Sequence, residues 1–197
     1  MCGRFALYSE KKIFSKFNIK VSRNFNISPG QNVLIIDNHQ NLKIMKWGIK
    51  PNWKKTLIIN ARNESLTTKK TFLNLNRCVF IADGYYEWKL TNQIKIPYYH
   101  YLKEDLLFFA GVYDDSGCCI VTKESCVYLS EIHSRQPFFL RENQIKSWVN
   151  KNDKDLCFDD LVLCHPVSQR VNRIWNNTSD LILENNNYID NFIFKMK

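Results

Sequence analysis

The stretch RCVFIADGYYEW, residues 77–88, is dense in the β-branched and aromatic residues that favour strands. Similar runs recur at short intervals along the chain, and Asn, Gly or Asp residues, which favour turns, stand between several of them. These runs occupy residues 32–37, 42–49, 56–62, 98–113 and 118–125. The pattern predicts a largely antiparallel, partly barrel-like β-sheet.

Helical spacing of apolar residues interrupts this β-rich pattern in a few places. In the first, Ile13, Phe14 and Phe17 share a face, and Ser9 is placed to cap the N-terminus of the helix. The stretches that predict helices are 9–17, 65–75 and 141–149. Strands with flanking helices of this kind predict the α+β class.

The length and composition fit one globular unit. A chain of 197 residues with 45% hydrophobic content can bury the core of a single domain. No fixed-period repeat and no linker rich in Pro, Gly or Ser divides it, so we expect one domain over residues 1–197. The last stretch, residues 181–197, is Asn-rich and then apolar, and we expect it to dock as a strand or helix or to fray.

The chain is basic, with 28 Lys and Arg residues against 19 Asp and Glu residues, a formal charge of +9 and a pI near 9.2. This balance suits a polyanionic partner such as nucleic acid, and it equally suits a charge that serves solubility. No apolar run approaches the length that crosses a bilayer, so we expect no membrane partner.

The cysteines predict a reducing compartment rather than a disulfide framework or a metal site. Their number, 7, is odd, and the chain starts without the apolar core of a signal peptide. Cys118 and Cys119 are adjacent, and Cys157 and Cys164 form no CxxC pair with a matching His. We therefore expect no metal and no cofactor, and a location in the cytosol or nucleus.

Cys2 stands directly behind the initiator methionine, in MCGRF. A residue this small at the second position favours removal of the methionine, which would leave Cys2 with a free α-amine and a thiol. These two groups on adjacent carbons react together with aldehydes. Cys2 is therefore the candidate nucleophile, whereas the other cysteines are expected to be buried and inert.

Three further stretches carry candidate polar residues. Asn60 and Arg62 follow an apolar run, Glu87 stands between Tyr86 and Trp88, and His133 and Arg135 alternate so that both side chains face the same way if the segment is extended. Each has a structural alternative as well: a turn cap for Asn60, a solvent-facing strand position for Glu87 and a hydrogen-bonded histidine for His133. The arginines could be surface charges.

Taken together, the motifs resemble those of a known family. MCGRF, WGIKPNW, NARNES, RCVFIADGYYEW, HSRQP and HPVSQRVN appear in the order and approximate spacing of the SOS response-associated peptidase (SRAP) family of abasic-site processing proteins. The resemblance covers residues 2 to about 176. It implies an SRAP-like fold and a sensor that crosslinks itself covalently to abasic sites in single-stranded DNA.

The resemblance assigns roles to individual positions. The nucleophile matches Cys2, and the other polar site residues match Asn60, Glu87 and His133. The arginines that hold phosphates match Arg4, Arg62 and Arg135; the stacking tryptophans match Trp53 and Trp88; a threonine near the site matches Thr122; Trp47 is left to the core.

The resemblance has two departures, and it leaves other activities open. Gln136 stands where the family commonly has methionine, and Lys50 stands where an apolar residue is usual. Because a Cys, a His and an Asn also resemble a thiol-peptidase set, self-processing at Met1 is an alternative activity. A non-covalent single-strand binder and an abasic-site lyase are further alternatives. We expect a monomer, cytoplasmic in a bacterium and nuclear in a eukaryote.

Overall fold

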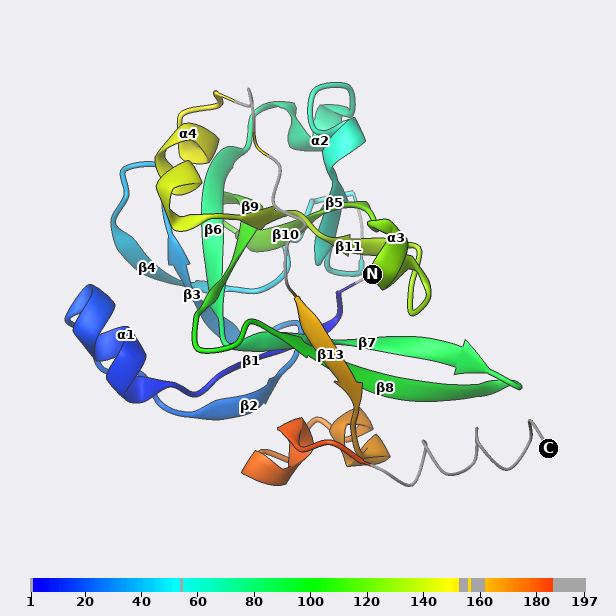
Figure 1. The fold of residues 1–197 in the computed structure, drawn as a ribbon. Helices are drawn as coiled ribbons and strands as arrows, with labels where there is room; N and C mark the ends of the chain where they lie inside the picture. The colour runs from blue at the N-terminus through cyan, green and yellow to red at the C-terminus, as the bar shows by residue number, and fades with distance from the viewer. Residues whose placement is uncertain (1, 54, 153–155, 157–161, 186–197) are drawn as a thin grey trace.

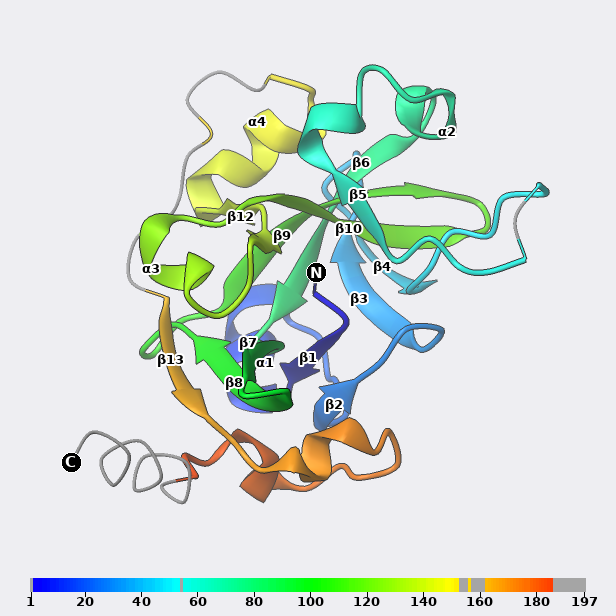
Figure 2. The same cartoon turned by 90° about the vertical axis from the view of Figure 1, so that its right-hand side faces the viewer.

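The computed structural model describes residues 2–53, 55–152, 156 and 162–185. Two β-sheets form its framework, with short helices around them (Figures 1 and 2). Strand pairing is antiparallel throughout the described named strands, except for one parallel pair. The α+β class and the largely antiparallel sheet are confirmed, and the strands form two sheets that are not closed into a barrel.

The five-stranded sheet positions the N-terminus. Its strand order is β13-β8-β7-β1-β2. The bounds are β1 Arg4–Leu7, β2 Asn24–Ile27, β7 Gly84–Thr91, β8 Ile94–Tyr101 and β13 Leu163–Pro166. Strands β7 and β8 form a hairpin that projects from the body of the protein (Figure 1).

The eight-stranded sheet carries most of the core. Its main path is β11-β10-β9-β6-β3-β4, with β12 pairing β9 and β5 pairing β10 in parallel. The bounds are β3 Asn32–Ile36, β4 Leu42–Lys46, β5 Asn60–Arg62, β6 Asn76–Ala82, β9 Leu107–Asp114, β10 Gly117–Glu124, β11 Arg135–Pro137 and β12 Phe139–Leu140.

The helices are short. The α-helices are α1 Glu10–Phe17, α2 Lys70–Leu73, α3 Val127–Ser130 and α4 Ile145–Val149, and the 3₁₀ turns are η1 Asn63–Ser65, η2 Glu142–Gln144, η3 Gln169–Asn172 and η4 Ser179–Ile182. All three predicted helical stretches contain helix. The apolar face of the third is confirmed, since Ile145, Trp148 and Val149 are buried.

In the first predicted helix, two details differ from expectation. Ser9 occupies the N-cap position, but its side chain makes no capping hydrogen bond. Ile13 is buried, whereas Phe14 is 49% exposed, so the buried face is narrower than the sequence spacing indicates. The helix covers the core mainly through Ile13.

The run 77–88, which reads as one β-rich stretch in the sequence, divides between the two sheets. Strand β6 ends at Ala82 and β7 begins at Gly84, with Asp83 at the corner. The Asp83 carboxylate accepts the backbone N–H groups of Tyr8 and Ser9 at 2.6 and 2.8 Å. A Cβ at position 84 would lie 2.4 Å from the His100 carbonyl oxygen, so glycine permits the close approach of β8. This corner turns the chain from the core sheet into the projecting hairpin.

Trp47 lies in the core, as expected. Its side chain is fully buried, its ring centroid lies 5.1 Å from that of Phe5, and its Nε1–H donates to the Ile59 carbonyl at 3.0 Å. The described part of residues 181–197 ends at residue 185, and the expected docking or fraying of the remainder lies outside the described residues. Among the described helices, none has the length and apolar character of a membrane span.

Candidate functional site

Strand β1 directs the N-terminal residues toward Glu87. Arg4 pairs with Tyr86 and Phe5 pairs with Tyr85 in the antiparallel ladder between β1 and β7. Antiparallel strands run in opposite directions, so the chain before Arg4 passes the residues after Tyr86. Cys2 and Glu87 therefore lie close together, and the Glu87 charge acts on the Cys2 thiol.

Cys2 is buried and held through its backbone. The Asn60 side-chain Nδ2–H donates to the Cys2 carbonyl oxygen at 2.8 Å. The other amide atom, Asn60 Oδ1, is buried and has no hydrogen-bond partner among the described residues. Asn60 therefore fixes Cys2 while keeping a free acceptor beside it, in an environment where an unused acceptor is costly.

The Cys2 side chain is a thiol rather than a thiolate at neutral pH. Burial raises its pKa well above the ordinary value for cysteine, and the nearby Glu87 carboxylate raises it further. Its Sγ contacts the Arg4 carbonyl oxygen at 3.8 Å. A reaction at this sulfur must therefore remove its proton during the attack.

Glu87 and His133 lie close together. Glu87 is 5% exposed, and its burial raises the pKa of the carboxyl group, an effect that the positive charge of His133 opposes. His133 Nε2 lies 3.9 Å from Glu87 Oε1. Glu87 comes from β7 and His133 from the turn between α3 and β11, so the pair bridges the two sheets.

The orientation of the His133 ring is set by its own backbone neighbourhood. The backbone N–H of Arg135 donates to His133 Nδ1 at 3.0 Å. Because Nδ1 accepts this bond, the neutral ring carries its proton on Nε2, the atom that faces Glu87. In the other tautomer, Nδ1 would instead donate to the Arg135 carbonyl oxygen, which lies 3.2 Å away.

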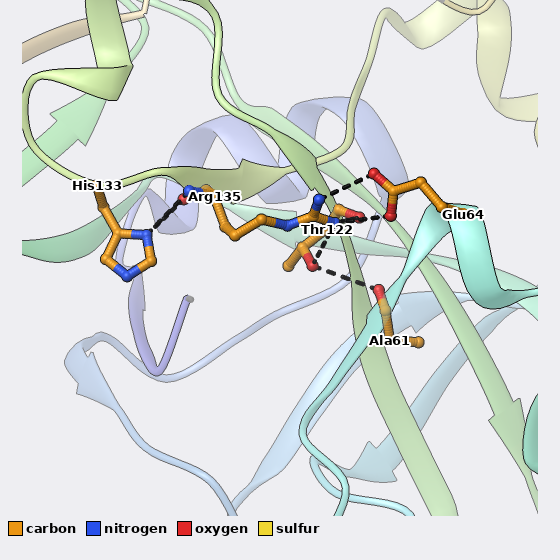
Figure 3. A network of polar contacts seen from close by, with 5 residues as sticks. All are labelled: Ala61, Glu64, Thr122, His133 and Arg135. Carbon is orange, nitrogen blue, oxygen red and sulfur yellow. Dashed lines mark hydrogen bonds and ion pairs between the residues drawn. The ribbon is translucent and has the colours of Figure 1, made fainter.

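The Arg135 side chain points away from His133 and into a separate polar cluster (Figure 3). Its guanidinium makes two parallel bonds to Glu64, at 2.8 and 3.0 Å, and a third to the Thr122 carbonyl oxygen at 2.7 Å. The hydroxyl of Thr122 donates to the Ala61 carbonyl oxygen at 3.4 Å. Position 133 precedes β11, so the extended alternation that would place both side chains on one side is absent.

Glu64 is therefore a member of this polar cluster that the sequence pattern did not single out. The Arg135 hydrogen bond lowers the pKa of its carboxyl group, so Glu64 stays ionised and partly neutralises the guanidinium. The signal was present, because Glu64 belongs to the quoted motif NARNES, two residues after Arg62. Its role depends on a contact with β11, more than 70 residues away.

The other two predicted phosphate-binding arginines lie in different surroundings. Arg4 Nη1 donates to Asn26 Oδ1 and to the Val171 carbonyl oxygen, both at 2.7 Å, and burial lowers the pKa of the guanidinium. Arg4 thus ties β1 to β2 and η3. Arg62 ends β5 with an exposed side chain. Of the three arginines, Arg62 is the most accessible to a ligand.

The two predicted stacking tryptophans are accessible to different degrees. Trp53 is 70% exposed in the loop after β4. Trp88 is half-buried on β7, and its Nε1–H donates to Asn172 Oδ1 at 2.9 Å, which fixes the indole plane. The sequence pattern did not predict this contact of Asn172, although Asn172 is the last residue of the motif HPVSQRVN.

A groove of about 740 Å³ is lined in part by Glu87 and His133. One wall is the β7–β8 hairpin, and the other is the end of α3 with the turn that follows it. Its lining residues are Glu87, Trp88, Lys89, Leu90, Lys95, Ser130, Glu131, Ile132, His133 and Ser134. Trp88 and two lysines thus belong to the same groove lining as Glu87 and His133.

Two positions that depart from the family pattern lie outside this groove lining. Gln136 is buried, and its Oε1 accepts the backbone N–H of Cys126, the N-cap residue of α3, at 2.8 Å. Lys50 is exposed. Within the described residues, no group of three or more His, Cys, Asp or Glu side chains is placed to hold a metal ion.

Comparison with known proteins agrees with the motif resemblance. The family model of the SOS response associated peptidase (SRAP) family matches residues 1–174. "Abasic site processing protein YoaM" of Bacillus subtilis is 34% identical, over 92% of this chain and 97% of its own. "Abasic site processing protein YedK" of Escherichia coli is 27% identical, over 92% and 99% of the two chains.

Solved structures support the fold. A crystal structure of a protein from Bacteroides thetaiotaomicron superposes with a TM-score of 0.72 and covers 91% of each chain at 19% sequence identity. At this identity the similarity concerns the fold alone.

Proposed function

Since the chain belongs to the SOS response associated peptidase (SRAP) family, we propose that it processes abasic sites in DNA by forming a covalent link through Cys2. The observation that supports this most strongly is the placement of Cys2. It is buried, held by Asn60 and electrostatically coupled to Glu87, a carboxyl group with a raised pKa. A buried cysteine of purely structural function would need no such neighbours.

The proposed reaction needs Cys2 to be the first residue, and therefore needs the removal of Met1. The ring-opened sugar of an abasic site carries an aldehyde at C1′. The Cys2 α-amine, with an ordinary pKa near 8, is partly unprotonated at neutral pH and adds to this aldehyde. Loss of one water molecule gives an imine, a bond between the Cys2 nitrogen and C1′.

An imine alone would endanger the DNA strand. Its protonated form acidifies the C2′ proton and promotes elimination of the 3′ phosphate. In the proposed next step the Cys2 sulfur adds to C1′, the thiol proton is removed and the nitrogen gains a proton. The product is a five-membered thiazolidine with a tetrahedral C1′, and the strand stays intact.

Glu87 and His133 are the groups proposed to move these protons. A carboxyl group with a raised pKa can donate a proton as water leaves, and the resulting carboxylate can accept the thiol proton. This acceptor is required because burial keeps the Cys2 side chain protonated. His133, which faces Glu87 through Nε2, can relay the proton to or from solvent.

The groove supports a preference for single-stranded DNA. Unpaired bases can stack on an aromatic ring, and Trp88 offers one that is fixed by Asn172. Lys89 and Lys95 line the same groove, where they can contact phosphates. In a duplex the bases are paired and stacked on one another, so this arrangement favours single strands, whose bases are unpaired.

A second candidate activity is a thiol-dependent peptidase, limited to removal of Met1. The residue types fit, because Cys2, His133 and Asn60 are all present in the site. In the structure His133 Nε2 faces Glu87, and Asn60 holds the Cys2 backbone. These contacts favour the chemistry of a processed Cys2, with self-processing as its preparatory step.

The decisive experiment is the intact mass of the purified protein before and after incubation with a single-stranded oligonucleotide that carries one abasic site. We expect a protein without Met1 that gains the oligonucleotide mass minus one water, and no gain in Cys2→Ala. Retained Met1, or no adduct on the processed protein, would overturn the proposal. A cleaved oligonucleotide as the main product would instead indicate a lyase.

A further inference from the structure

A turn after η3 presents an aromatic side chain that no step of the proposed reaction uses. Trp175 is 70% exposed and its neighbour Ile174 is 55% exposed. The guanidinium carbon of Arg173 lies 5.3 Å from the centroid of the Trp175 ring, within the range of a cation–π contact. The exposed ring and the guanidinium beside it present an aromatic and a cationic group on the same turn.

The turn is held by several hydrogen bonds, although its tip is exposed. The backbone N–H of Asn176 donates to the Arg173 carbonyl oxygen at 3.0 Å and closes the turn. The Asn26 side-chain Nδ2 donates to the carbonyl oxygens of Arg173 and Asn176 at 3.1 and 2.8 Å. Asn26 also accepts from Arg4, so the tip is braced against the first strand of the site. A ligand would therefore meet a preorganised surface.

The turn is linked to Trp88, a residue of the groove lining. Asn172, three residues before Trp175, accepts the hydrogen bond from Trp88 Nε1 at 2.9 Å. Three residues span at most about 11 Å of chain, so the half-buried Trp88 and the exposed Trp175 lie within reach of one short DNA strand. In Figures 1 and 2 the η3 segment lies beneath the five-stranded sheet, on the side below the N-terminus.

We propose that Trp175 and Arg173 form a second stacking platform for unpaired bases of the DNA strand that passes Trp88. The charge and the ring favour a nucleic acid over an apolar partner: a base can stack on the free part of the indole while the arginine reaches a neighbouring phosphate. This inference rests on the proposed function, because it states where the single DNA strand bound in the groove would continue along the protein surface.

DNA single strands of different lengths test the proposed stacking platform. Fluorescence anisotropy would compare the affinities of wild type, Trp175→Ala and Trp175→Phe for undamaged single strands of about 4 to 16 nucleotides, a range that covers the site sizes of comparable binders. We expect Trp175→Ala to bind long strands about 5-fold to 100-fold more weakly than wild type, and Trp175→Phe to keep most of the wild-type affinity. For the shortest strands, the affinities of wild type and Trp175→Ala should differ less. Ile44→Ala, which removes an equally exposed side chain from β4, is the control and should match wild type.

The outcomes separate the two proposals. Equal affinities of Trp175→Ala and wild type at every length would overturn the platform, and so would a loss that is equal at all lengths or is shared by Ile44→Ala. Absence of a covalent adduct in wild-type protein would overturn the proposed function, whichever way the affinities fall. A tip that binds a protein instead of DNA would give the first of these results.

Discussion

His133 Nε2 lies 3.9 Å from Glu87 Oε1, while its other ring nitrogen accepts the backbone N–H of Arg135 at 3.0 Å. The imidazole is thus held with one nitrogen committed to the backbone and the other directed at a carboxyl group. Burial raises the pKa of that carboxyl group. A carboxyl group with a raised pKa beside an imidazole nitrogen suits a reaction that first needs an acid and then a base.

Glu87→Gln should slow adduct formation by about 100-fold or more, the usual scale of general acid–base catalysis. Glutamine keeps the shape and loses the proton transfer. In wild type, the protonated carboxyl group of Glu87 is the proton donor. Because its pKa is raised, the part of the adduct-formation rate that depends on this donor should persist toward neutral pH and decline as the carboxyl group ionises. Single-turnover rates from pH 5 to 8 should show this limb in wild type and lack it in Glu87→Gln. A similar profile in both proteins would remove Glu87 from the chemistry.

The same substitution should stabilise the fold. A carboxyl group whose folded-state pKa is raised destabilises the folded protein once it ionises more readily in the unfolded chain. This penalty begins near the ordinary Glu pKa of about 4.3, grows toward the raised folded value and stays constant above it. Thermal unfolding should therefore show Glu87→Gln as more stable than wild type at neutral pH, with the difference vanishing under acidic conditions. A less stable variant at neutral pH would contradict the prediction.

Glu64→Gln should increase the affinity for undamaged single strands. The substitution removes the negative charge that partly neutralises Arg135 and leaves an acceptor in place. We expect tighter binding and a steeper salt dependence, by about 0.7 in the log–log slope for one added phosphate contact. Titrations at several salt concentrations measure both.

Glu142→Gln is the matched control for this substitution, because it breaks another surface ion pair, with Lys16, outside the groove lining. It should change neither the affinity nor the slope. If Glu64→Gln keeps the wild-type slope and only slows adduct formation, Arg135 does not contact phosphate. Its pair with Glu64 then acts by positioning the backbone that holds His133.

Gln136→Met should destabilise the protein by about 1 kcal/mol, because it leaves the partly buried backbone N–H of Cys126 without its Gln136 partner. Lys50→Leu, the other change toward the family pattern, alters an exposed position and should stay within about 0.5 kcal/mol of wild type. Urea unfolding of the two variants checks this contrast. Equal stabilities of Gln136→Met and wild type would mean that Met repacks the site without loss.

The sequence pattern predicted the longer strands, whose runs of β-favouring residues are easy to recognise. It missed short strands such as β1, whose place in the sheet depends on pairing with strands far along the chain. Strand β1 has only four residues, Arg4–Leu7, yet it lies between β2 and β7 and carries Cys2 into the site. Its position depends on long-range pairs such as Phe5 with Tyr85, which no local pattern encodes. The corner at Asp83 is similar, because its carboxylate acts on Tyr8 and Ser9 from 74 or more residues away.

The site shows the same division. The motif resemblance located Cys2, Asn60, Glu87 and His133, and the structure brings these four residues together. The ordered motifs did not reveal that the Arg135 side chain is already paired, because its partner Glu64 reaches it across the sheet from η1. Contacts of this kind follow from tertiary geometry rather than from residue type.

Asn60 offers the sharpest test of how Cys2 is held. Its Nδ2–H donates to the Cys2 carbonyl oxygen, and its Oδ1 is buried without a partner among the described residues. Asn60→Asp keeps the acceptor and loses the donor, whereas Asn60→Ala loses both. We expect Asn60→Asp to slow adduct formation about 10-fold or more, since an unheld nucleophile loses the orientation that the reaction depends on.

Comparison of the two Asn60 variants separates the donor from the acceptor. If Oδ1 accepts an N–H of the Cys2 amine in the processed protein, Asn60→Ala should be slower than Asn60→Asp, because only the aspartate still offers an oxygen there. If the donor to the Cys2 carbonyl carries the whole effect, the two variants should react at equal rates. Wild-type rates in both would show that burial alone positions Cys2, and would remove Asn60 from the proposed mechanism.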